Sequence, residues 1–258
     1  MKNIIQHNQA AWDAESKSAS EWCTPVSTEE IHQAKSGNWD VVLTPNRSVP
    51  RHWFGDISGK NILCLASGGG QQAPILAAAG AKVTSYDLSA AQLLKDQQVA
   101  SRDSLNITTI QGDMSHLDKL ADATFDLIFH PVSNVFVPEI GPVWREAYRV
   151  LKPAGRLLSG FLNPSYFLFD HEAETESQKL MAQFAAPYTE PNSLSKSGQQ
   201  ALQKSGRAYE FGHSLESQIG GQIAAGFTIS GFYEDNWNDA ATPLNRLSPT
   251  YVATLAIK

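Results

Sequence analysis

Short apolar runs alternate with longer stretches of helical periodicity from residue 60 onward. Strands that alternate with helices lie parallel and are joined by right-handed crossovers. The pattern therefore predicts an α/β fold built on a doubly wound, mostly parallel sheet. The runs rich in strand-forming residues are 61–66, 82–87, 107–112, 125–130 and 155–161.

The stretches between these runs carry signals for the ends of helices. One predicted helix ends on Gly80, and a second begins after Ser89, a residue type that favours the N-cap position. A third begins near residue 143, and Pro153 with Gly155 is predicted to stop it. Each predicted helix thus lies between two predicted strands.

The end of the chain changes character. Residues 215–226 predict a last helix, and residues 227–237 and 250–258 predict two strands with no helix between them. We expect these two strands to pair antiparallel at one edge, which gives a seven-stranded sheet.

Two segments fall outside the alternation, residues 1–59 and 162–213. Long segments in compact domains are often functional loops, so we expect the first to be a cap and the second an insertion that lines a ligand pocket. A solvated helical insertion is the alternative for the second segment. In the cap, residues 8–16 predict an amphipathic helix that closes over the ligand, and the roles of Trp12 and Trp53 stay open between ligand contact and core.

Composition narrows the class of protein. The 258 residues are 42% hydrophobic and 18% charged, as in a folded globular protein. The net charge of -6 lacks the basic excess that nucleic-acid binding needs, and no apolar run reaches membrane-spanning length. With no secretory signal, and with Cys23 and Cys64 expected to be reduced, we predict a cytoplasmic protein. The histidines are scattered, so no metal site is predicted.

The stretch CLASGGGQQAP, residues 64–74, places three glycines between a predicted strand and a predicted helix. Glycines there let backbone amides approach a ligand without a Cβ in the way. GGGQQA fits the pattern G-x-G-x-x-G/A, and Asp87 at the end of the next strand fits an acid that accepts hydrogen bonds from ribose hydroxyls. Together they predict a nucleoside-containing ligand, and the choice of nucleoside stays open on these residues.

Four motifs in order resemble the class I S-adenosylmethionine-dependent methyltransferases over most of residues 60–161. ILCLASGGGQQAPILAAAGAKVTSYDLSAAQL resembles the glycine-rich first motif, and IQGDM, FDLIFHPVSNVFV and REAYRVLKPAGRLL resemble the three that follow. The resemblance implies a Rossmann-like methyltransferase domain at 60–258. It implies S-adenosylmethionine as cofactor, with S-adenosylhomocysteine as product, and methyl transfer to a small-molecule acceptor.

The same resemblance implies individual cofactor contacts. The residues expected at the methionine portion are Ala66, Ser67, Gly68 and Gly70, and the loop amides are expected to meet its carboxylate. Asp87 is expected at the ribose, Leu88 and Met114 at the adenine ring, Asp113 at the adenine amino group, and the backbone around His130 at the cofactor's amino group. Cys64 and Ala66 stand where the family often has an acid and a glycine, so no charged contact to the ammonium group is expected from this strand.

Methyl transfer from a sulfonium is an in-line displacement that depends mainly on positioning, so a catalytic base is optional. His130 is the first such residue to consider because it ends the fourth predicted strand; a backbone contact or a satisfied polar group is the alternative. His213, His52 and Asp170 are weaker, since they merely fall in or near the outer segments. Two other functions stay open, a nicotinamide-dependent oxidoreductase and a noncatalytic module that binds S-adenosylmethionine. The sequence leaves the acceptor, the methylated atom and the oligomeric state open.

Overall fold

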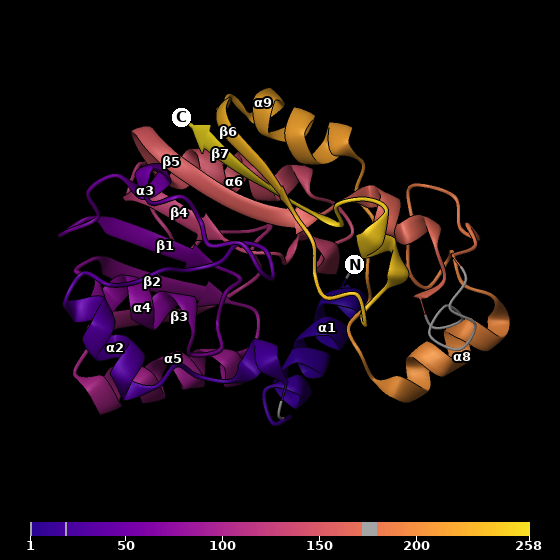
Figure 1. Cartoon of the computed structure of the whole chain (residues 1–258), viewed down its shortest axis with the longest axis horizontal. Coiled ribbons are helices and arrows are strands. Elements are labelled where there is room, and N and C mark those ends of the chain that lie inside the picture. The colour runs from indigo at the N-terminus through magenta and orange to yellow at the C-terminus, as the bar shows by residue number, and fades with distance from the viewer. Residues whose placement is uncertain (1, 19, 172–179) are drawn as a thin grey trace.

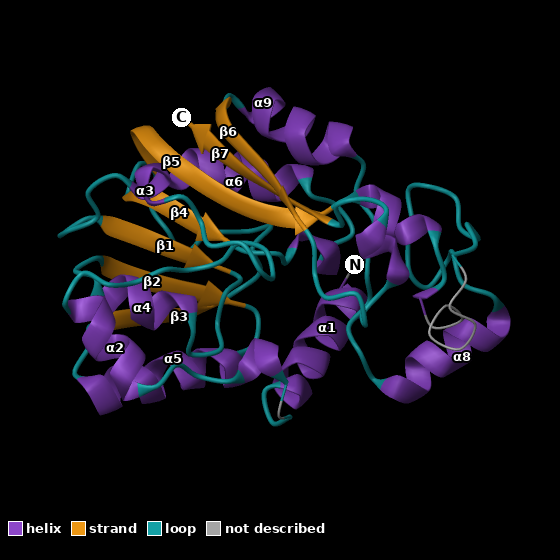
Figure 2. Ribbon diagram, viewed as in Figure 1, coloured by secondary structure: helices purple, strands orange, loops and turns teal. Residues whose placement is uncertain are grey.

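A computed structural model describes residues 2–18, 20–171 and 180–258, and it confirms a seven-stranded sheet with helices on both faces (Figures 1 and 2). The strands are β1 (Asn61–Leu65), β2 (Lys82–Asp87), β3 (Ile107–Gln111), β4 (Phe125–His130), β5 (Leu151–Leu162), β6 (Thr228–Asp235) and β7 (Tyr251–Ile257). The helices are α1 (Lys2–Glu15), α2 (Thr28–Lys35), α3 (Arg51–Phe54), α4 (Gln72–Ala78), α5 (Ala90–Asp103), α6 (Gly141–Val150), α8 (Lys196–Ser205) and α9 (Gly221–Ala225).

The strand order is β3-β2-β1-β4-β5-β7-β6. The first five strands are parallel, and β7 runs antiparallel to both β5 and β6, as the sequence predicted. From β1 the chain winds outward through β2 and β3, then returns to place β4 on the other side of β1. Because the winding reverses between β1 and β4, a crevice forms at the carboxyl ends of these strands, which is where open α/β sheets bind ligands.

The sheet separates two apolar cores. On one face, Ile31 of α2, Trp53 of α3 and Leu76 of α4 pack with the inward side chains of β1 and β4. On the other face, Trp144 of α6 packs against Leu63 and other strand residues. Trp53 is buried and its ring lies 5.3 Å from that of Tyr233 on β6, so its role is in the core.

The end of α6 differs from the sequence prediction. The helix stops at Val150, and β5 begins at Leu151, so Pro153 and Gly155 lie inside the strand instead of ending the helix. The register between β4 and β5 is irregular here, and a Cβ on Gly155 would lie 2.8 Å from the Lys152 carbonyl oxygen. Proline and glycine thus form a tight bend in the strand, a place where both residue types are tolerated.

The two outer segments meet near the carboxyl ends of the parallel strands (Figure 1). The predicted amphipathic helix is confirmed as α1, which contacts α5. The insertion contains a 3-10 turn, Pro164–Leu168, and α8, while its residues 172–179 lie outside the described part of the chain. The last predicted helix divides into a π-helical turn, Glu216–Gly220, and α9.

Candidate functional site

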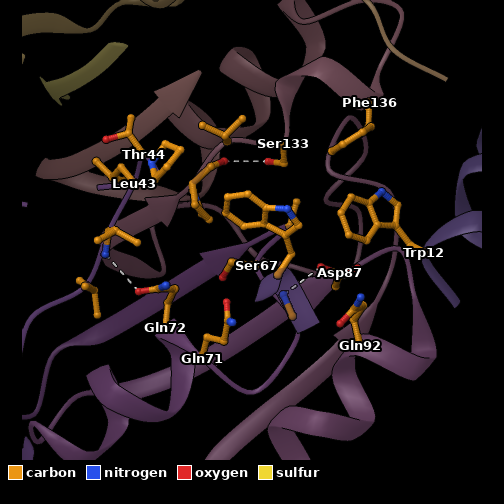
Figure 3. A pocket seen from close by; sticks show the side chains of 18 of the residues that line it. Trp12, Leu43, Thr44, Ser67, Gln71, Gln72, Asp87, Gln92, Ser133 and Phe136 are labelled. Carbon is orange, nitrogen blue, oxygen red and sulfur yellow. Dashed lines mark hydrogen bonds between the residues drawn. The ribbon is translucent and has the colours of Figure 1, made fainter. Parts of the chain in front are cut away.

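A cavity of about 840 Å³ lies at the carboxyl ends of β1, β2 and β4 (Figure 3). Its volume falls in the upper part of the range of about 300–1,000 Å³ that is typical of ligand pockets. The walls come from the glycine-rich loop, the strand ends, α1, residues 38–45 and the insertion. The cavity therefore joins the predicted nucleoside site to both outer segments.

The glycine-rich loop is tied to the protein through its own amides. Gly68 N donates to Asp87 Oδ2 at 2.9 Å, and Gly70 N donates to Asp96 Oδ1 at 2.7 Å. Gly69 N donates to the backbone oxygen of Gln92 at 3.1 Å. These three amides are already used, so the expectation that they meet a ligand carboxylate does not fit this arrangement.

Gly68 and Gly70 serve different purposes. Gly68 lines the cavity, and a Cβ there would lie 2.9 Å from the Cβ of Gln92 and 3.2 Å from Asp87 Oδ2. Gly70 is not among the described lining residues; its φ is +78°, and a Cβ would lie 2.9 Å from the Cβ of Pro25. Gly70 thus permits close packing of the N-terminal segment rather than contact with a ligand.

Asp87 lies where β2 ends, in the cavity wall. Its two carboxylate oxygens accept from Gly68 N and from Ser89 N, each at 2.9 Å. Burial raises the pKa of Asp87, and these backbone hydrogen bonds oppose that rise. A carboxylate has about four lone-pair sites, so Asp87 keeps capacity to accept hydrogen bonds from hydroxyl groups of a ligand.

The structure brings most of the predicted cofactor residues together. Asp113 also lines the cavity and accepts from Ser115 N at 2.8 Å through Oδ1, while Met114 is buried beside it. The predicted residues that share the cavity wall are Ala66, Ser67, Gly68, Asp87, Leu88, Asp113 and Met114.

His130 lies behind the cavity wall. Its imidazole is fully buried, with Nδ1 at 2.9 Å from the Leu65 backbone oxygen and Nε2 at 2.6 Å from Asn134 Oδ1. Burial lowers the pKa of the ring, although both hydrogen bonds favour the protonated form. His130 is not among the described lining residues, whereas the next residues, Pro131 and Val132, are. This position fits a satisfied polar group and gives the imidazole no open path to a substrate.

The three weaker base candidates are also absent from the described cavity wall. His213 Nε2 lies 2.9 Å from the backbone oxygens of both Asn134 and Val137. His52 is exposed on α3, and Asp170 follows the 3-10 turn of the insertion. None of them is placed to act on a molecule in the cavity.

Two carboxylates that sequence reasoning missed stand out in the structure. Asp96 of α5 is fully buried beneath the glycine-rich loop, and burial raises its pKa to about 7. Glu210 lines the cavity from the insertion, and burial raises its pKa to about 7 while Arg207 opposes the rise. A helical period of apolar residues could mark Asp96 as inward-facing, but no local signal marks Glu210.

Aromatic side chains form part of the cavity wall. The rings of Trp12 and Phe136 meet edge to face with centroids 5.0 Å apart. Figure 3 shows this pair on one side of the cavity and Leu43 with Thr44 on the other. Trp12 therefore faces the cavity and is not a residue of the two apolar cores.

Within residues 2–18, 20–171 and 180–258, no helix has the length and apolar character to cross a membrane. Over the same residues, no group of three or more His, Cys, Asp or Glu side chains could hold a metal ion.

Several known proteins are similar to this chain in sequence. Residues 63–159 match the family model described as a methyltransferase domain. The chain is 49% identical over 258 residues, the whole of both proteins, to the uncharacterized methyltransferase YbaJ of Bacillus subtilis (strain 168). It is 26% identical over 171 residues to a ubiquinone biosynthesis O-methyltransferase of Alkalilimnicola ehrlichii, which covers 65% of each chain.

A solved structure has the same fold. The S-adenosylmethionine-dependent methyltransferase of Mesorhizobium loti superposes with a TM-score of 0.61 at 18% identity, covering 81% of this chain and 95% of that one. The family match and the full-length relative set aside the oxidoreductase alternative. The chain belongs to the class I S-adenosylmethionine-dependent methyltransferases, and its cofactor is S-adenosylmethionine.

Proposed function

We propose that the enzyme methylates a small organic molecule that binds in the same cavity as the cofactor. In this proposal residues 1–59 form a cap on a methyltransferase domain, 60–258, and residues 162–213 complete the acceptor pocket. The observation that carries the proposal is one cavity whose wall holds both the cofactor-motif residues and an aromatic pair, Trp12 and Phe136. The similarity to an O-methyltransferase of quinone biosynthesis is consistent with a small acceptor.

The residues of the wall fit the cofactor. Asp87 has free lone pairs for the ribose hydroxyls, and Leu88 and Met114 provide apolar surface for the adenine ring. Asp113 retains an oxygen that can accept from the adenine amino group. Gly68 keeps the approach to Asp87 open, since any Cβ there would crowd the carboxylate.

When bound, S-adenosylmethionine supplies an electrophilic methyl group. The chain's own contribution to an in-line displacement is to hold the acceptor in position and to exclude water, which can account for much of the rate enhancement. Trp12 and Phe136 close the cavity from α1 and from the turn after β4. His130 supports that turn through Asn134, and we assign it no proton transfer.

We also propose a cytoplasmic location. Cys23 and Cys64 are both buried free thiols, and burial raises the pKa of each. Unpaired buried thiols are typical of proteins from reducing compartments.

Calorimetric titration with S-adenosylmethionine, S-adenosylhomocysteine and NADH tests the cofactor site directly. We expect saturable binding of the two adenosyl sulfur compounds and none of NADH. Transfer of a labelled methyl group to low-molecular-mass compounds then tests the acceptor class. A protein that binds the cofactor and methylates other macromolecules, but no small compound, would contradict the proposal.

A further inference from the structure

The described residues of the cavity wall include acidic side chains and no basic ones. Among the described lining residues there is no Lys, Arg or His, while five carry carboxylates. An anionic acceptor that moved from water into this pocket would lose its hydration and gain no cationic partner. This desolvation costs free energy in a pocket of limited polarity. The wall favours an acceptor that is neutral or positively charged.

Four of the five carboxylates already accept hydrogen bonds from the protein. Glu30 accepts from Ser27 in a capping box, Asp40 accepts from Ser48, and Asp87 and Asp113 accept from backbone amides; these bonds lie in the described part of the chain. The carboxylate of Glu210 has no hydrogen bond or ion pair to any described residue. Among the described lining residues, Glu210 is therefore the acid whose carboxylate lacks such a partner.

Among the described residues, Arg207 is the cation whose charge lowers the pKa of Glu210, and it is committed to another acid. Arg207 forms a two-point ion pair with Glu190, with nitrogen to oxygen distances of 2.7 and 3.0 Å. Glu190 is fully buried and also accepts from Tyr188 Oη and from the backbone amide of Glu210. This network fixes the backbone at Glu210 but leaves its carboxylate unpaired.

Glu210 lies beside the aromatic wall. Asn8 of α1 donates to the backbone oxygens of Phe136 and Tyr209, and it accepts from Tyr209 N at 2.8 Å. On the other side of Glu210, Phe211 N donates to the backbone oxygen of Val135 at 2.8 Å. The chain thus places Glu210, which lines the cavity, next in sequence to residues that bond to the turn carrying Phe136, whose ring meets Trp12. An organic cation is attracted both to a carboxylate and to the face of an aromatic ring.

We propose that the methyl acceptor of this cavity is an organic cation, a protonated amine on an apolar body, held by Glu210 and the Trp12–Phe136 pair. The proposal rests on the proposed function, because it concerns the acceptor of that same cavity. Burial raises the pKa of Glu210 to about 7, so tests belong near pH 8, where most of the carboxylate is ionised.

Three probes of similar shape and different charge test the proposal: phenethylamine, phenethyl alcohol and phenylacetate. Their affinities are measured by tryptophan fluorescence of the full chain saturated with S-adenosylhomocysteine, whose own binding is first established by calorimetry. We compare the wild type, Glu210→Gln, and Glu139→Gln as a control that removes an exposed carboxylate outside the cavity wall.

We expect the wild type and Glu139→Gln to bind the amine about tenfold more tightly than the alcohol or the carboxylate. Glu210→Gln should lose that preference and keep its affinity for the alcohol and for S-adenosylhomocysteine. Equal binding of all three probes by the wild type, or a preference for phenylacetate, would overturn the proposal. A loss of S-adenosylhomocysteine affinity in Glu210→Gln would assign the carboxylate to the cofactor and overturn it too. Failure of the wild type to bind S-adenosylhomocysteine, by contrast, would count against the cofactor assignment alone.

Discussion

Replacing Asp96 by asparagine tests how the glycine-rich loop is supported. The buried carboxylate accepts from Ser85 Oγ at 2.6 Å and from Gly70 N at 2.7 Å. Burial raises the pKa of Asp96 to about 7, although these hydrogen bonds oppose the rise. An aspartate in the unfolded chain has a pKa of about 3.9. The folded protein therefore keeps a proton on Asp96 over a range in which the unfolded chain has lost it.

The sign of the effect on stability follows from this difference. Between the two pKa values the folded state binds more protons than the unfolded state, so the free energy of unfolding falls as the pH rises. About three pH units at about 1.4 kcal/mol each give a loss of about 4 kcal/mol, which is nearly complete above about pH 7. Asparagine does not titrate, keeps an oxygen for Gly70 N, and can donate to Ser85 Oγ. Asp96→Asn should therefore gain stability relative to the wild type as the pH rises.

Urea denaturation followed by tryptophan fluorescence measures the difference in unfolding free energy between the two proteins at each pH. Between about pH 5 and pH 8 the difference should change by about 3 kcal/mol in favour of Asp96→Asn. The exposed Asp118 supplies the control, because Asp118→Asn should track the wild type. If the stability curves of Asp96→Asn and the wild type ran parallel across this range, the buried carboxylate would not be protonated in the folded state and the reasoning would fail.

Two further substitutions separate ligand binding from support of the fold. Asp87→Asn removes a charged acceptor and turns an amide NH2 toward the backbone N–H of Gly68 or Ser89. In calorimetry, S-adenosylhomocysteine should therefore bind about 10- to 100-fold more weakly. An unchanged dissociation constant in a folded variant would refute the ribose assignment. His130→Ala removes a fully buried ring with two hydrogen bonds and should lower the unfolding free energy by about 2–4 kcal/mol. The dissociation constant of S-adenosylhomocysteine should change less than about threefold. A large loss of affinity without a loss of stability would instead show that His130 contributes to ligand binding.

Much of the core could be predicted because its signals are local. Strands β2 and β4 have the bounds that the sequence predicted, and Ser89 caps α5 by accepting from Gln92 N at 3.1 Å. The position of Asp87 in the cavity wall could be predicted because the carboxyl ends of parallel strands meet at one edge of the sheet. The end of α6 was missed, since a proline that stops a helix and a proline in a strand bend leave the same mark in the sequence.

Other features of the site depend on contacts between distant segments. Asn8 joins residues 136 and 209, and Asp96 reaches back to Gly70, so neither role follows from neighbours in the sequence. His130 ends a strand as predicted, yet its ring turns into the interior, where the Leu65 backbone and Asn134 hold it.

Local signals were enough to predict the order of strands and helices along the chain, the glycine-rich loop and the acid that follows it, because periodicity and turn chemistry act within a few residues. Which polar groups face the cavity, and which are buried as partners of the backbone, follows from contacts between segments that are far apart in the sequence. These positions depend on packing between residues 1–59, the sheet and residues 162–213. In the part of the chain that the structure describes, Glu210 lines the cavity without a bonded partner for its carboxylate, while Asp96 and His130 bond to backbone beneath the wall.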